Sequence, residues 1–131
     1  AEALYLSLLR ILKDSGRDDD SHQRRRIVAC ATALETARLW LLRAAWNVEA
    51  TGAGPSKANL SLLAREVTED TCRTVMGHVE QALGMSAHEE GSPIERGRRD
   101  LSLFLCQAVP DAKRDRVGRA LVASGDLAER L

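Results

Sequence analysis

Apolar residues recur every three to four positions along most of the chain, a spacing that predicts helices. The first segment covers residues 2–14 and ends at Ser15-Gly16, where glycine can take the left-handed conformation that closes a helix. Strict alternation of apolar and polar residues, which marks a half-buried strand, is absent. The pattern therefore predicts an all-α chain. The core positions expected in this first helix are Leu4, Leu8, Leu9, Ile11 and Leu12.

Two longer helices of nearly equal length follow in the pattern. One runs from His22 to about Ala50, and the other follows a Gly- and Pro-containing break, with Ser56 as its expected N-cap, and continues to Gly84. The expected core positions of the first are Ile27, Ala31, Leu34, Leu41, Ala45 and Val48, with Trp40 and Trp46 as further packing groups. Those of the second are Leu60, Leu63, Ala64, Val67, Thr71, Val75, Val79 and Ala82.

A fourth helix has the sharpest start signal in the chain. Ser92 is a suitable N-cap, Pro93 suits the first helical position, and Glu95 can reach back to the cap amide. This helix should run to about Ala108, before Pro110, and a last short helix should start at Asp111. The sequence thus predicts one domain over residues 1–131. Its expected architecture is an antiparallel four-helix bundle with a short extra C-terminal helix.

Charge and hydropathy restrict the partners of this domain. The 19 basic and 19 acidic side chains cancel, so no global field draws the protein to nucleic acid or to an anionic membrane surface. No apolar run approaches the roughly 20 residues that a membrane span requires, and no charged-then-apolar leader is visible. We therefore expect neither nucleic acid nor a membrane as partner.

The cysteines bear on the cellular compartment, and the first residue bears on whether the chain is a fragment. Cys30, Cys72 and Cys106 are odd in number, far apart and set in apolar helical patterns, as expected of reduced, buried thiols in a cytoplasmic protein. Ala1 lies inside an apolar helical pattern without an initiator Met or a capping residue before it. We expect the chain to be the C-terminal fragment of a larger protein.

Searches for catalytic or ligand-binding patterns leave few candidates. The histidines His22, His78 and His88 lie in different segments without a Cys-x-x-Cys partner, so a metal site is not expected. His78 is a catalytic base or, alternatively, a hydrogen-bonded histidine at the bundle edge. The arginines of 24–26 either grip a phosphate or form a solvated face that the aspartates of 18–20 neutralise.

A cluster of charged residues lies near the start of the fourth helix, which must bury one face. It consists of Arg96, Arg98, Arg99 and Asp100. Arg99 and Asp100 lie between apolar positions of a helix whose one face must be buried, and a buried charge requires partners. The structural interpretation is an ion pair that locks this helix to a neighbour, and the functional one is a binding site.

Residues 81–85 and 93–100 together resemble a sequence block of the acyl-CoA dehydrogenase family. In that family a helix ends Gln-x-Leu-Gly-Gly, and the next opens Pro-x-Glu-Arg/Lys-x-x-Arg-Asp; this chain has Gln-Ala-Leu-Gly-Met and Pro-Ile-Glu-Arg-Gly-Arg-Arg-Asp there. Residues 34–38 and 60–66 are similar to the earlier helices of the family's C-terminal bundle, and residues 104–111 to a divergent bacterial branch. The resemblance covers nearly the whole chain.

This resemblance implies a three-domain flavoprotein whose C-terminal bundle forms one wall of an FAD site and part of a dimer or tetramer interface. By position, Gln81 corresponds to a glutamine that contacts the flavin nucleotide of a neighbouring subunit, and Gly84 to the first glycine of the same turn. Arg99 and Asp100 are the other residues expected nearest to the cofactor. Met85 departs from the family's second glycine.

The family's reaction pairs a carboxylate that removes the α-proton of an acyl thioester with hydride transfer to FAD. In many members that glutamate lies nine residues after the arginine that corresponds to Arg99, where this chain has Ala108. The fragment alone is therefore not expected to be a catalyst, and its catalytic residues are unknown. The resemblance implies the C-terminal domain of an FAD-dependent oxidoreductase, and the alternative is a non-catalytic helical association module derived from that fold.

Overall fold

The computed structural model describes residues 1–50, 55–106 and 110–124, and in these ranges the chain is helical without strands. The all-α prediction is confirmed. The elements are α1 (Glu2–Asp14), α2 (Ser21–Glu49), α3 (Pro55–Leu83), the short 3₁₀ helix η1 (Gly84–His88), α4 (Pro93–Cys106) and α5 (Pro110–Ser124).

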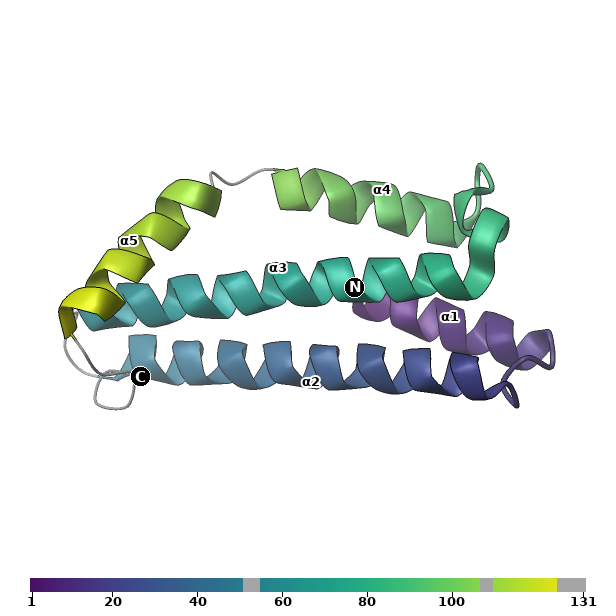
Figure 1. Cartoon of the computed structure of the whole chain (residues 1–131), viewed down its shortest axis with the longest axis horizontal. Coiled ribbons are helices and arrows are strands. Elements are labelled where there is room, and N and C mark those ends of the chain that lie inside the picture. Colours follow the sequence, from purple (N-terminus) through teal and green to yellow (C-terminus); the bar gives the residue numbers. More distant parts are fainter. Residues whose placement is uncertain (51–54, 107–109, 125–131) are drawn as a thin grey trace.

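The framework of the molecule is a hairpin of two long helices. α2 and α3 have 29 residues each and lie antiparallel, side by side (Figure 1). α1 and α4, with 13 and 14 residues, are half as long and pack along the half of the hairpin where α2 begins and α3 ends. α5 lies against the first half of α3. Four helices therefore pack together, as the predicted bundle requires, only along the half of the hairpin that α1 and α4 cover.

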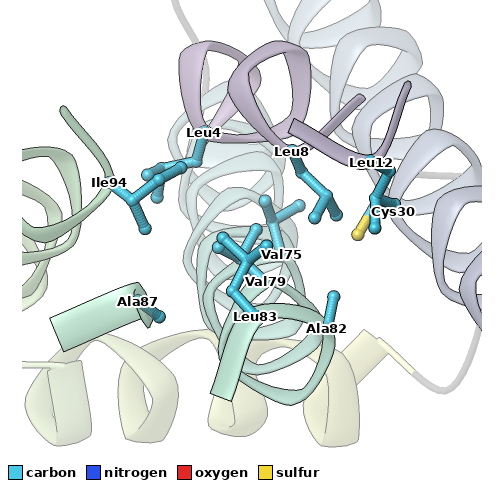
Figure 2. Packing of buried hydrophobic residues seen from close by; sticks show 10 residues of the cluster. All are labelled: Leu4, Leu8, Leu12, Cys30, Val75, Val79, Ala82, Leu83, Ala87 and Ile94. Carbon is cyan, nitrogen blue, oxygen red and sulfur yellow. The ribbon is translucent and has the colours of Figure 1, made fainter. Parts of the chain in front are cut away.

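The main core lies between α1, α2, α3 and α4. Leu4, Leu8 and Leu12 project from one face of α1: Leu8 points toward Val75 of α3, whereas Leu4 lies beside Ile94 of α4 and Leu12 beside Cys30 of α2 (Figure 2). Their spacing of four residues keeps them on one helix face, whereas Ile11, also expected in the core, is 37% exposed. A second, smaller cluster of Ala44, Leu60 and Ala64, with Trp40 against it, holds the other half of the hairpin.

The buried face of α2 differs from the expected one. α2 buries every seventh residue, a repeat typical of helices that pack in a coiled-coil manner. These residues are Gln23, Cys30, Ala37 and Ala44. Most are small, which allows α3 to approach closely. Leu41, Val48 and Trp46 were expected to pack and are 48%, 59% and 77% exposed, because no second helix covers that half of α2.

The helix starts are set by local polar groups. Asp20 caps α2 by accepting a 2.7 Å hydrogen bond from the amide of His22. Ser92 caps α4 as predicted, with its hydroxyl accepting from the Glu95 amide at 3.1 Å. The reciprocal part of that prediction is wrong, since the Ser92 amide donates to the Glu89 carbonyl at 3.1 Å.

Two expected helix boundaries are wrong, and a third lies outside the described residues. α3 begins at Pro55, so Ser56 lies inside the helix instead of capping it, in accord with the preference of proline for the first helical position. For the same reason α5 begins at Pro110 and not at Asp111. The expected end of the fourth helix at Ala108 lies outside the described residues.

Close approach of α1 and α4 depends on a glycine. A Cβ atom added to Gly97 would lie 2.9 Å from Cδ2 of the buried Leu4. Real Cβ atoms do not tolerate such a contact without movement of their neighbours, and tightly packed cores resist such movement. Gly97 therefore leaves the space that the buried Leu4 side chain occupies between the two short helices.

Candidate functional site

Two of the residues expected at the cofactor lie exposed at the end of α3. Gln81 lies in the last turn of the helix, and its side chain is exposed. Gly84 follows with φ +58°, a conformation that glycine adopts without strain, and no heavy atom lies within 4 Å of an added Cβ. Met85, which takes the place of the family's second glycine, is 87% exposed. This turn offers an amide side chain and open backbone to a ligand.

The other two expected residues, Arg99 and Asp100, lie on the outer side of α4. Arg99 Nη1 lies 3.1 Å from the Glu95 carboxylate, and Asp100 Oδ2 lies 3.9 Å from Nε of Arg96. Both ion pairs join residues four apart in one helix, and the Arg99 and Asp100 side chains are 61% and 64% exposed. Neither residue locks α4 to a neighbour, so that part of the structural interpretation is wrong for them.

Arg98, another member of the predicted cluster, forms the ion pair that locks α4 to a neighbour, so the structural interpretation is confirmed for this residue. Its side chain is 16% exposed, and its Nε donates to Glu80 Oε1 of α3 at 2.8 Å. Nη1 donates to the Ala87 carbonyl of η1 at 3.1 Å and lies 3.2 Å from Nδ1 of His88. One guanidinium thus holds α3, η1 and α4 together around the exposed turn.

The sequence contained a signal for this role. Residues three and four apart share a helix face, so the buried Ile94 and the half-buried Leu101 place Arg98 on the inner side. Arg99 and Asp100 lie between the same two apolar residues in sequence, yet on the opposite side of the helix. Helical spacing, not sequence proximity, identifies the buried charge.

Two further candidates have clear surroundings. Arg24 donates to the Asp19 carbonyl and lies 3.4 Å from the Asp19 carboxylate, which confirms the self-neutralised face at the start of α2 for this arginine. His78 is half-buried on α3, and its Nδ1 is buried without a hydrogen-bond partner among the described residues. The expected bundle-edge hydrogen bond is therefore not made at Nδ1.

The cysteines are free, and two of the three are buried as expected. Burial raises the pKa of the Cys30 and Cys72 thiols, which favours their protonated, unreactive form. Cys106 is exposed, contrary to expectation, because it lies near the end of α4 beyond the cover of α1. In the described ranges, no three His, Cys, Asp or Glu side chains lie close enough together to bind a metal ion.

Nothing in the described helices is long and apolar enough to cross a membrane. Ala108 lies outside the described residues. It occupies the position at which the resemblance predicted a catalytic glutamate. The exposed turn at Gln81 and Gly84, held by Arg98, is consequently the best-defined candidate site.

Comparison with known proteins identifies the helical framework. A family model for the acyl-CoA dehydrogenase C-terminal domain matches residues 5–105, from within the first turn of α1 to one residue before the end of α4. No curated protein and no solved structure matches the chain. Since the family model covers most of the chain, including the turn at Gln81 and the opening of α4, the chain belongs to the acyl-CoA dehydrogenase C-terminal domain family.

Proposed function

We propose that this chain is the C-terminal domain of a larger, FAD-dependent oxidoreductase of the acyl-CoA dehydrogenase type. In this proposal the domain contributes one wall of the flavin site and part of a dimer or tetramer interface. The observation that carries it is that Gln81 and Gly84 are exposed at the end of α3, while the buried Ala82 and Leu83 between them and the Arg98 contacts with Glu80 and Ala87 hold the segment in place. The enzyme's substrate would be an acyl thioester, and three free thiols favour a cytoplasmic setting.

The residues at this turn fit a nucleotide cofactor in part. The exposed Gln81 amide has both donors and an acceptor to offer, and the space beside Gly84 lets a ligand reach the backbone. Arg99 and Asp100 are themselves exposed and pair only within α4, Arg99 with the partly buried Glu95 and Asp100 with the exposed Arg96, so both side chains are accessible to a ligand. When bound, FAD supplies the hydride acceptor for the reaction.

An exposed apolar stripe on α2 supports the proposed oligomer interface. Leu39, Leu42 and Trp46 recur three and four residues apart, on one face, and are 56%, 45% and 77% exposed. Clustered apolar exposure, including an aromatic side chain, is typical of surfaces that bind other protein chains. A second copy of the chain would cover it.

Purification of the complete parent chain under native conditions tests the flavin proposal. We expect flavin absorbance in the purified protein, or its recovery after addition of FAD to stripped protein. Gln81→Ala should raise the FAD dissociation constant about tenfold, the effect of losing one or two hydrogen bonds to a ligand. The matched control is Thr74→Ala, an exposed position two turns earlier in α3. Absence of flavin before and after reconstitution would refute the proposal.

A second candidate function is a non-catalytic association module, which the stripe on α2 favours on its own. It predicts that the 131-residue chain self-associates without FAD. Light scattering at increasing concentration should show dimers or larger species that Trp46→Glu disperses. Val122→Glu, at an equally exposed apolar position of α5, should leave association unchanged. A chain that stays monomeric at high concentration would contradict this candidate.

A further inference from the structure

A cavity opens between α3 and α5. These two helices meet at the opposite end of α3 from its last turn, where Gln81 lies (Figure 1). Its volume is about 220 Å³, and its apolar wall consists of Leu62, Leu63, Val117, Gly118 and Leu121. An apolar cavity of about 150 Å³ already holds a benzene molecule in another protein. This cavity therefore has room for a short alkyl chain.

The side of the cavity next to Gly118 is open because that residue has no side chain. No heavy atom lies within 4 Å of a Cβ added there. Glycine is among the poorest helix formers, so its place in the middle of α5 is unfavourable for the helix itself. The volume that a larger side chain would occupy is instead part of the cavity.

The carboxylates at the cavity wall are neutralised by arginines. Glu69 is 3% exposed, and Arg65 donates to its Oε1 at 2.9 Å, with Arg73 3.6 Å from Oε2. Glu66 accepts from Nε of Arg114 at 2.7 Å, which joins α3 to α5. These ion pairs balance the charge of both carboxylates, although Oε2 of Glu69 accepts no hydrogen bond from any described residue.

Uncompensated positive charge lies at the entrance. A wider groove of about 610 Å³ shares Leu62, Arg65 and Lys113 with the cavity and also includes Arg116 and Phe104. No described acidic residue pairs with Lys113 or Arg116, and Lys113 is half-buried. Arg65 lies over the Phe104 ring at 5.6 Å from its centroid. The groove thus combines an apolar floor with free cations.

We propose that the cavity and groove form a binding site for a linear alkyl carboxylate, separate from the proposed flavin site. The alkyl chain enters the cavity between Leu62, Val117 and Gly118. The carboxylate lies in the groove and accepts hydrogen bonds from Lys113 and Arg116. Burial of the chain supplies affinity, and the cations select a negatively charged head group.

Calorimetric titration of the 131-residue chain with octanoate, 1-octanol and acetate tests this site. Octanoate should bind with measurable heat, and each methylene from butanoate to octanoate should tighten binding up to about fourfold. Octanol lacks the charge and acetate lacks the chain, so both should bind at least tenfold more weakly. Equal affinity for octanoate and octanol, or for octanoate and acetate, would overturn the proposal, as would absence of octanoate binding.

Two variants separate the cavity from the groove. Gly118→Leu fills the cavity with a better helix former and should abolish octanoate binding while α5 stays folded. Lys113→Gln should weaken octanoate binding about tenfold, with no effect on octanol. Gly77→Leu and Lys13→Gln, outside the site, serve as matched controls. Unchanged octanoate binding by Gly118→Leu would overturn the proposal. Flavin content, measured separately, reports only on the other site.

Discussion

The guanidinium of Arg98 in α4 binds the carboxylate of Glu80 in α3, eighteen residues earlier in the chain. The same side chain donates to the Ala87 carbonyl in η1, so it joins three elements at the end of the bundle. The proposed flavin wall, from Gln81 to Gly84, lies between these anchors in sequence. The geometry of the candidate site therefore depends on an arginine outside it.

Replacement of Arg98 by Met should lower the free energy of unfolding by about 2 kcal/mol, because it leaves Glu80 and the Ala87 carbonyl without their charged donor. Urea denaturation measures the difference. The matched control is Arg99→Met, which removes an exposed pair within α4 and should cost less than about 0.5 kcal/mol. Equal losses in the two variants would contradict the assigned role of Arg98.

Substitutions of two helical glycines should have opposite effects on stability. Gly77→Ala adds a Cβ in open space and should raise the free energy of unfolding by about 0.5–1 kcal/mol. Gly97→Ala should lower it by about 1 kcal/mol, because overpacking against Leu4 exceeds the gain in helix propensity. Thermal denaturation of both variants provides the test, and a stabilised Gly97→Ala would show that the Leu4 side chain moves aside at little cost.

The N-cap of α2 should make part of the stability pH-dependent. The hydrogen bond from the His22 amide lowers the pKa of the Asp20 carboxyl below its usual 3.8. A carboxyl whose pKa is depressed in the folded state contributes stability above its unfolded pKa, and this contribution disappears as pH falls through the folded pKa. Asp20→Asn keeps a capping oxygen but does not titrate there.

The denaturation midpoint should therefore fall less between pH 7 and acidic pH in Asp20→Asn than in the parent chain. The control is Asp19→Asn, whose side chain is fully exposed beside Arg24. If the parent chain and Asp20→Asn lose the same stability between neutral and acidic pH, the Asp20 carboxylate does not make the stability pH-dependent.

The inner face of α1 should contribute far more to stability than its outer face. Leu8 is completely buried, and Leu8→Ala should cost about 2–5 kcal/mol by loss of burial and creation of a cavity. Leu6, on the same helix, is 53% exposed, so Leu6→Ala should change stability by less than about 0.5 kcal/mol. Urea denaturation of both variants tests which face of α1 packs, and comparable losses would place α1 differently.

Local signals were sufficient to find the helices and several of their ends. The Ser92 cap and the buried Leu4, Leu8 and Leu12 follow from residue type and helical spacing, which depend on near neighbours in the chain. The family assignment also came from the sequence, through the block from Gln81 to Asp100, and the family model confirms it.

Only the tertiary structure determined which faces are covered. Trp46 and Leu41 have the periodicity of core residues but remain exposed, because α1 and α4 cover half of the long hairpin. Arg98, not Arg99, became the interhelical lock because Glu80 and Ala87 lie opposite the inner face of α4. The sequence by itself determined helix positions through local spacing and capping. Which side of each helix meets a neighbour was decided by packing between residues distant in the chain.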